Sequence, residues 1–167
     1  MGVAGAGKTT VGSLLAERLG WEFVDADSFH SKANVEKIMQ GIALDDADRE
    51  PWLEGIRAAE LRWVAEGRKV VLACSALKRA YRKKLNVGPA VKFVYLKGNR
   101  EVIASRLRGR QGHFAGEQLL AGQLAALEEP ENAIAIDVGK SPEEIVTEIV
   151  IRLRSDGWIQ STDWVLI

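Results

Sequence analysis

Short, uninterrupted apolar runs alternate along this chain with longer segments of helical spacing, and this alternation restricts the fold more than any other feature. Residues 70–74, 93–96 and 133–136 contain no charged side chain, and residues 21–24 are a further short strand candidate. Such runs are typical of strands buried on both faces of a parallel sheet. Strands that alternate with helices predict an α/β fold of three layers around a parallel central sheet.

Two helix starts are visible in the pattern. Apolar side chains repeat at helical spacing after Pro51, a residue type favoured in the first turn, so we expect a helix to begin near Pro51. Further on, Ser141 and Glu144 have the spacing of a capping box and predict the start of a last helix.

Composition indicates one globular domain over residues 1–167. The chain has 23 basic and 23 acidic side chains and a net charge of zero, which gives no general attraction to nucleic acid or an anionic membrane surface. No apolar run is long enough to span a bilayer, and no leader pattern opens the sequence. The single cysteine, Cys74, excludes an internal disulfide framework and continues an apolar run, so we expect a core residue in a cytoplasmic protein.

The most specific motif is GVAGAGKT at residues 2–9, which matches G-x-x-x-x-G-K-[ST] in full. In this motif the glycines let backbone N–H groups surround a phosphate, and the helix that follows adds the positive end of its dipole. Lys8 is expected to reach the β- and γ-phosphates of a nucleotide, and the Thr9 hydroxyl to be a ligand of Mg²⁺. No guanine-reading Asn-Lys-x-Asp accompanies the motif.

The strand that normally leads into such a loop is absent, because only Met1 precedes Gly2. A missing central strand would leave unpaired edges in the sheet, so we expect an upstream extension to raise the melting temperature. The apolar run at residues 164–167 could fill the gap, in its own or a neighbouring chain, but we expect the tail at about 155–167 to be frayed or packed elsewhere.

Acidic residues follow the first strand candidate. Asp25 and Asp27 would lie at the carboxyl end of that strand, where open α/β sheets bind ligands. One carboxylate could hold Mg²⁺ and the other accept a proton from an attacking hydroxyl; a helix cap beside a solvated acid is the alternative. The acids of residues 45–48 could simply cap the helix expected near Pro51.

Cations gather at two further places. Lys78 and Arg79 follow a small polar turn at a strand end and suit an anionic, hydroxylated ligand, although a charge run is often only a solvated helix face. Arg106 and Arg110 lie in a glycine-containing loop and suit a lid, at about residues 106–118, that closes on a transferring phosphoryl group.

Together these segments resemble the gluconate kinase (gluconokinase) family of P-loop small-molecule kinases. The resemblance rests on GVAGAGKTT, WEFVDADSFH, LDDADREPWL, VVLACSALKRAYRKKL, RLRGRQGHF and LEEP, from residue 2 to about 140. Shikimate kinases share the loop and an Asp-x-Asp, but typically carry a glycine triplet where this chain has Cys74, Ser75 and Ala76.

The resemblance implies ATP-dependent phosphorylation of D-gluconate to 6-phospho-D-gluconate, which feeds the pentose phosphate pathway, with ATP and Mg²⁺ as cofactors and a homodimer as the assembly. The residues expected to bind ATP are Gly2, Val3, Ala4, Gly5, Ala6, Gly7, Lys8, Thr9, Thr10, Arg106 and Arg110. Thr9 and Asp25 would hold the metal, and Lys8, Asp27 and Arg110 would be catalytic. Those expected to bind the substrate are Asp27, His30, Arg49, Lys78, Arg79 and His113.

Two other functions remain open from the sequence. One is phosphorylation of another small acceptor, such as shikimate or a nucleotide, because arginines also serve such acceptors. The other is a nucleotide-binding module without turnover, which the missing first strand favours. Acceptor-dependent release of ADP would separate these functions.

Overall fold

A computed structural model describes residues 1–108, 113–157 and 164–166, with side chains outside residues 113–118 and 164–166. Five parallel strands form one sheet in the order β1-β2-β5-β3-β4. The strands are β1 (Glu22–Asp25), β2 (Val70–Ala73), β3 (Val91–Lys97), β4 (Ile134–Asp137) and β5 (Trp164–Leu166). The helices are α1 (Lys8–Leu19), α2 (Lys32–Met39), α3 (Asp46–Ala65), α4 (Arg79–Leu85), α5 (Arg100–Arg108), α6 (His113–Ala126) and α7 (Pro142–Ser155).

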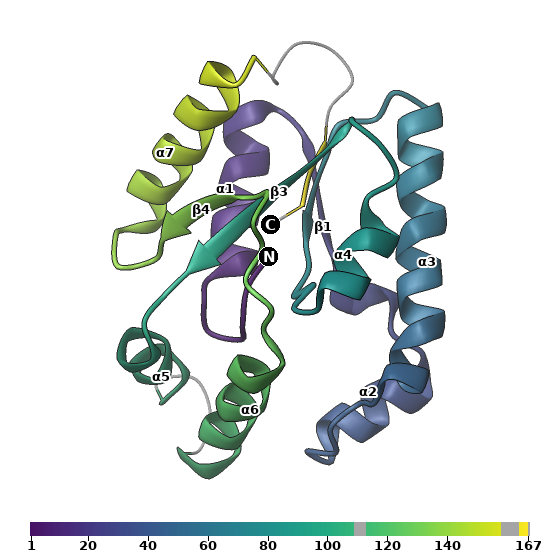
Figure 1. The fold of residues 1–167 in the computed structure, drawn as a ribbon, viewed down its shortest axis with the longest axis vertical. Coiled ribbons are helices and arrows are strands. Elements are labelled where there is room, and N and C mark those ends of the chain that lie inside the picture. The colour runs from purple at the N-terminus through teal and green to yellow at the C-terminus, as the bar shows by residue number, and fades with distance from the viewer. Residues whose placement is uncertain (109–112, 158–163, 167) are drawn as a thin grey trace.

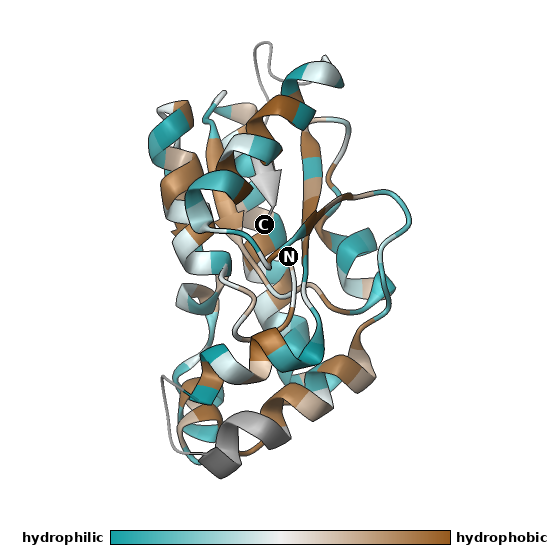
Figure 2. Cartoon of the chain, turned by 90° about the vertical axis from the view of Figure 1, so that its left-hand side faces the viewer, coloured by the Kyte–Doolittle hydropathy of each residue, from teal (hydrophilic) through white to brown (hydrophobic). Residues whose placement is uncertain are grey.

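Helices cover both faces of the sheet, as the alternation of runs predicts. Helices α1 and α7 lie on one face and α3 and α4 on the other, while α2 and the α5–α6 pair extend beyond the sheet (Figure 1). Hydrophobic and hydrophilic positions both occur along the strands, and the helices show mixed faces (Figure 2). The expected three-layer α/β fold is therefore confirmed.

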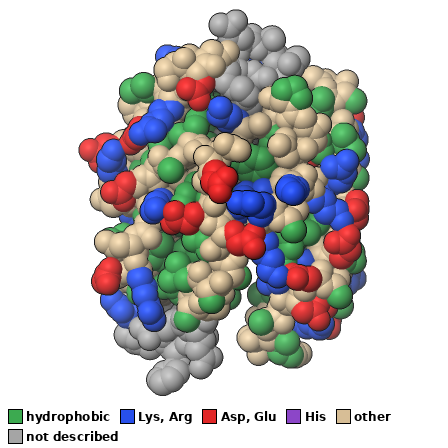
Figure 3. Space-filling view, in the orientation of Figure 1, with side chains coloured by type: hydrophobic (Ala, Val, Ile, Leu, Met, Phe, Trp, Pro, Cys, Tyr) green, Lys and Arg blue, Asp and Glu red, His purple; other side chains and the backbone are tan. Residues whose placement is uncertain are grey.

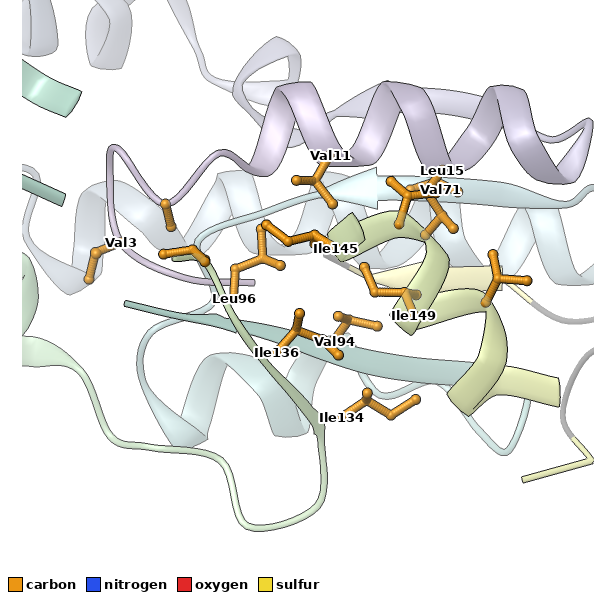
Figure 4. Packing of buried hydrophobic residues seen from close by; sticks show 14 of the residues in the cluster. Val3, Val11, Leu15, Val71, Val94, Leu96, Ile134, Ile136, Ile145 and Ile149 are labelled. Carbon is orange, nitrogen blue, oxygen red and sulfur yellow. The ribbon is translucent and has the colours of Figure 1, made fainter. Parts of the chain in front are cut away.

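Two apolar clusters fill the spaces between these layers. Figure 4 shows the first, in which Val11 and Leu15 of α1 and Ile145 of α7 meet the sheet side chains. The second lies against α3 and α4 and includes Trp52, Leu53, Ile56 and Trp63. Cys74 is buried in the second cluster and burial raises the pKa of its thiol to about 12, which confirms it as a core residue.

Helix α3 begins earlier than the position of Pro51 predicts. Asp45 is its N-cap and forms a reciprocal capping box with Asp48, so Pro51 lies inside the helix. The prediction of a start near Pro51 is wrong because the capping box satisfies the first amides one turn upstream. The capping box predicted at Ser141 and Glu144 is confirmed at the start of α7.

The C-terminal run occupies the centre of the sheet. Strand β5 lies between β2 and β3 and is parallel to both; its partners include Val71 and Lys92, both opposite Val165. The expectation of a frayed or packed tail is wrong for Trp164–Leu166, and the alternative that this run fills the gap in its own chain is confirmed. Beyond β5 along the same gap, the Met1 nitrogen donates to the Val94 carbonyl, and Leu96 N–H donates back to the Met1 carbonyl at 2.9 Å. Figure 1 shows the N-terminus close to β5 there.

Candidate active site

The glycine-rich segment is a loop that leads from the sheet into α1. Gly7 is the N-cap of α1 with a φ of 93°, a left-handed conformation that favours glycine. A Cβ on Gly2 would lie 2.9 Å from the Leu96 carbonyl oxygen, so a side chain there would force the loop off the sheet. No side chain caps α1, and its first turn contains no acid. The first amides of α1 therefore remain available to an anion.

The lysine of the motif is folded back onto its own loop. Lys8 Nζ donates to the Val3 carbonyl at 3.0 Å. Burial lowers the pKa of Lys8, against the opposing effect of nearby Cys74, Asp27 and Asp25. A phosphate group would restore a charged partner to this ammonium group, which favours binding of an anion at the loop.

Asp25 joins the loop to the acidic turn. The Thr9 hydroxyl donates to Asp25 Oδ2 at 3.1 Å, and Asp27 N–H donates to Asp25 Oδ1 at 3.0 Å. Asp25 is the last residue of β1 and caps the single turn Ala26–Phe29, so the predicted position at a strand end is confirmed. A hydroxyl and a carboxylate fit a hard cation such as Mg²⁺, which takes its remaining ligands from phosphates and water.

Asp27 projects into solvent beside a buried histidine. The Asp27 side chain is 88% exposed, whereas that of His30 is 9% exposed and places Nε2 3.9 Å from Asp27 Oδ1. Burial is the main cause of the lowered pKa of His30; the charge of Asp27 raises this pKa, and that of Arg49 lowers it further. An exposed carboxylate next to a neutral imidazole is suited to accept a proton from an incoming hydroxyl.

Two of the predicted substrate cations already have acidic partners. Lys78 Nζ donates to both carboxylate oxygens of Asp46 at 2.7 Å, and Tyr81 Oη donates to the same carboxylate. The bond from Lys78 is the main cause of the lowered pKa of Asp46. Arg79 pairs with Glu131 at 3.0 Å. Arg49 lies close enough to Asp46 for its charge to lower the pKa of the Asp46 carboxyl group as well.

Hydrogen bonds from Arg82 and Glu128 hold the turn that carries Lys78. Arg82 is buried, and its Nη1 donates to the carbonyls of Ala76 at 3.0 Å and Leu77 at 2.7 Å. Ala76 has a φ of 42°, which is uncommon for a residue with a side chain. Glu128 N–H donates to the Leu77 carbonyl at 3.0 Å, and the Glu128 carboxylate accepts from Arg79 N–H.

The lid residues are placed only in part. Arg106 Nη2 donates to the Val138 carbonyl at 2.6 Å, and its Nη1 lies 3.9 Å from the position a Cβ on Gly7 would occupy. Gln123 of α6 accepts from the loop amide of Ala4 at 2.6 Å. Arg110 lies outside the described residues, and His113 opens α6 with its side chain undescribed.

The structure thus places several of the predicted residues in two neighbouring groups. The loop, Thr9, Asp25 and Arg106 lie on the side predicted to bind phosphate (the phosphate side); Asp27, His30, Arg49 and Lys78 lie on the side predicted to bind the acceptor (the acceptor side), and Asp25 connects the two. Thr10 lies on the exposed first turn of α1. Figure 3 shows a notch at the lower edge of the molecule with α2 on one side, and interspersed acidic and basic side chains above it.

Sequence reasoning missed several contributors to this site. Asp46 was expected only as a cap, and Arg82 and Glu128 had no assigned role, yet each holds a predicted substrate residue or its turn. Two of these contacts join residues far apart in the sequence, 32 positions for Asp46 and Lys78 and 49 for Arg79 and Glu128, so no local pattern marks them. The available signal was that Asp46, Arg82 and Glu128 lie in three of the segments that carry the family resemblance, LDDADREPWL, VVLACSALKRAYRKKL and LEEP.

No helix in the described ranges has both the length and the apolar character needed to cross a membrane. Within the same ranges, no three His, Cys, Asp or Glu side chains cluster as a metal site.

Comparison with known proteins agrees with this geometry. The sequence model of the shikimate kinase family matches residues 4–154. A probable gluconokinase of Xenopus tropicalis is 46% identical, over 89% of this chain and 88% of the relative. A gluconokinase of Arabidopsis thaliana is 44% identical, over 90% of this chain and 88% of the relative.

A solved structure extends the likeness to three dimensions. The crystal structure of a gluconokinase from Sinorhizobium meliloti superposes with a TM-score of 0.82 at 41% identity, and the match covers 96% of this chain and 94% of that one. The chain therefore belongs to the gluconokinase family of P-loop kinases, within the shikimate-kinase-like fold.

Proposed function

We propose that this chain transfers the γ-phosphoryl group of ATP to D-gluconate and releases 6-phospho-D-gluconate, a substrate of the pentose phosphate pathway. The observation that carries the proposal is the position of Asp25, which bonds to Thr9 of the phosphate loop and to the backbone of Asp27. A nucleotide site and an acceptor site are thereby held side by side, as transfer between two bound substrates requires.

On the phosphate side, the amides of residues 2–10 would surround the phosphates of ATP, and Lys8 would turn from the Val3 carbonyl to the β- and γ-phosphate oxygens. Thr9 and Asp25 would hold Mg²⁺, which when bound neutralises charge on these phosphates. Arg106, together with Arg110, would stabilise the charge on the transferring group.

On the acceptor side, Asp27 would accept the proton of the terminal hydroxyl of gluconate, with His30 and His113 as hydroxyl-binding neighbours. Lys78 and Arg79 would contribute to the same site while keeping their acidic partners. Arg49, whose charge reaches both His30 and Tyr81, would be the main cation for the gluconate carboxylate.

Shikimate is the second candidate acceptor, because the matching family model is that of shikimate kinase. The turn after β2 favours gluconate instead, since Cys74, Ser75 and Ala76 stand where shikimate kinases typically carry a glycine triplet.

The deciding measurement is coupled release of ADP with Mg-ATP and D-gluconate, against no acceptor, shikimate and a nucleoside monophosphate. Release with gluconate alone is the expected result. Release of ADP with shikimate or the monophosphate alone would show that this compound, and not gluconate, is the acceptor. Binding of ATP without any acceptor-dependent release of ADP would show that the chain is a nucleotide-binding module without turnover.

The role of Asp27 has its own test. Asp27→Asn keeps the size of the side chain and removes its capacity to accept a proton, so kcat with gluconate should fall by roughly 10²–10⁴-fold. Asp156→Asn, at the C-cap of α7, is the control and should leave kcat unchanged. A near-normal kcat in Asp27→Asn would remove the proton-acceptor role.

We also propose, from the family resemblance, a cytoplasmic homodimer. Light scattering of the purified chain should give twice the mass of one chain, and a monomer would contradict it.

A further inference from the structure

Trp52, on the second turn of α3, touches two parts of the acceptor side at once. Its ring is buried and stacks on the imidazole of His30, with ring centroids 4.8 Å apart and planes 10° apart. Its indole Nε1–H donates to the carbonyl of Ala26 at 2.7 Å. One side chain therefore contacts both the histidine and the backbone of the acidic turn.

The bond to Ala26 fixes the peptide group that carries Asp27. The carbonyl end of the Ala26–Asp27 peptide accepts from Trp52, and its N–H end donates to Asp25 Oδ1 at 3.0 Å. A peptide held at both ends cannot rotate without breaking a hydrogen bond, and the bond from Trp52 is buried, where a lost partner is costly. The exposed side chain of Asp27 is therefore attached to a backbone whose orientation is fixed by hydrogen bonds.

Stacking fixes the imidazole of His30 in the same way. Nδ1 is buried without a hydrogen-bond partner, so no bond at that atom sets the orientation of the ring. Burial also lowers the pKa of His30, which disfavours the charged form that would pair with a carboxylate. The flat contact with Trp52 remains as the feature that directs Nε2 toward Asp27, 3.9 Å away.

We propose that Trp52 is a positioning residue of the acceptor site, which presents the Asp27 carboxylate and His30 Nε2 together to the hydroxyl that is phosphorylated. Helix α3 also carries Arg49 and Asp46, so Trp52 ties the acidic turn to the helix that bears the charged acceptor residues. The kinetic consequence of this inference rests on the proposed function, whereas the contacts of Trp52 do not depend on it.

Two substitutions separate the two contacts. Trp52→Phe keeps an aromatic ring for His30 and removes the N–H donor to Ala26; Trp52→Leu removes both. Trp63→Phe is the matched control, because Trp63 is equally buried on α3 and packs edge-on against Phe29 of the same turn, with centroids 6.5 Å apart.

The kinetic readout is kcat and KM for gluconate and KM for ATP. Because small displacements of a reacting group cost large factors in rate, Trp52→Phe should lower kcat by about 10-fold to 100-fold and leave KM for ATP within about twofold. Trp52→Leu should in addition raise KM for gluconate, since His30 loses its support. Trp63→Phe should change none of the three constants. A Trp52→Phe enzyme with normal kcat, or an equal loss of kcat in Trp63→Phe, would overturn the proposal.

The structural readout needs no substrate. His30 is one of two histidines in the chain, and a ring stacked on an indole has proton NMR signals displaced to high field. The displaced His30 signal should be present in the unmodified chain, persist in Trp52→Phe and be lost in Trp52→Leu, with His113→Gln to assign the other histidine. An undisplaced signal in the unmodified chain refutes the positioning role whatever the acceptor is. A displaced signal without gluconate-dependent ADP release refutes the proposed function instead, and supports the geometry on which the positioning role depends.

Discussion

At the scale of single residues, the carboxyl group of Glu60 is a buried polar group without a hydrogen-bond partner. Glu60 lies on α3, its residue surface is 0% exposed, and neither of its carboxylate oxygens has a hydrogen-bond partner. Burial raises the pKa of Glu60 to about 9, against a small opposing effect of Arg57. The folded protein therefore keeps this group protonated at neutral pH.

This pKa sets a dependence of stability on pH. Between the ordinary value near 4.5 and about 9, the unfolded chain releases the proton and the folded chain keeps it. The free energy of unfolding is thus highest below the unfolded pKa and falls as pH rises, by up to about 1.4 kcal/mol per pH unit from this group. Glu60→Gln cannot ionise, so its stability relative to the unmodified chain should increase from pH 5 to pH 8.

Urea unfolding at pH 5 and pH 8 measures this difference. The control is Glu17→Gln, because Glu17 is exposed on α1 and should show the same small effect at both pH values. A constant difference between Glu60→Gln and the unmodified chain across this range would mean that Glu60 is ionised in the folded state.

At the scale of elements, the turn after β2 depends on contacts from α4 and from the segment after α6. Arg82 bonds to two successive carbonyls of this turn, those of Ala76 and Leu77. Arg82→Gln should leave at least one of them unpaired and lower the free energy of unfolding by about 2 kcal/mol. KM for gluconate should rise as well, because Lys78 follows directly in the turn.

Arg57→Gln is the matched control for this substitution. Arg57 also donates from a guanidinium group to a backbone carbonyl, that of Lys84 at 2.8 Å, but outside the turn. It should lower the melting temperature and leave KM for gluconate unchanged. An Arg82→Gln protein whose KM stays normal despite a lowered melting temperature would limit Arg82 to a role in stability.

The same elements show what a sequence can and cannot predict. Strands β2, β3 and β4 and the cap of α7 follow from apolar runs and one capping box, because those signals are local. The loop that ends at Gly7, the N-cap of α1, follows from a motif whose spacing is also local. Contacts such as Asp46 with Lys78, or Trp52 with Ala26, depend on how distant elements pack, and no local pattern encodes them.

At the scale of the whole molecule, the centre of the sheet is built from both ends of the chain. Strand β5 fills the gap beside the first half of β3, and Met1 and Gly2 continue along the second half, where Gly2 N–H donates to the Ser75 carbonyl at 3.2 Å. The phosphate loop begins at this same Gly2. Pairing of β5 and the placement of the loop therefore depend on the same two neighbouring strands, β2 and β3.

Proline at Val165 tests this dependence. Val165 lies opposite Val71 on one side and Lys92 on the other, so Val165→Pro removes a backbone donor from a central strand and should disrupt its pairing. Val165→Ala keeps that donor and is the control. The melting temperature should fall by several degrees more in the proline variant than in the alanine variant, since a loss of about 1 kcal/mol shifts a domain of this size by roughly 2–4 °C. Binding of ATP should weaken in parallel because the loop loses part of its support.

Equal melting temperatures in the two variants would show that β5 does not stabilise the sheet. A normal affinity for ATP at a lowered melting temperature would show that β3 and Ser75 hold the loop without β5.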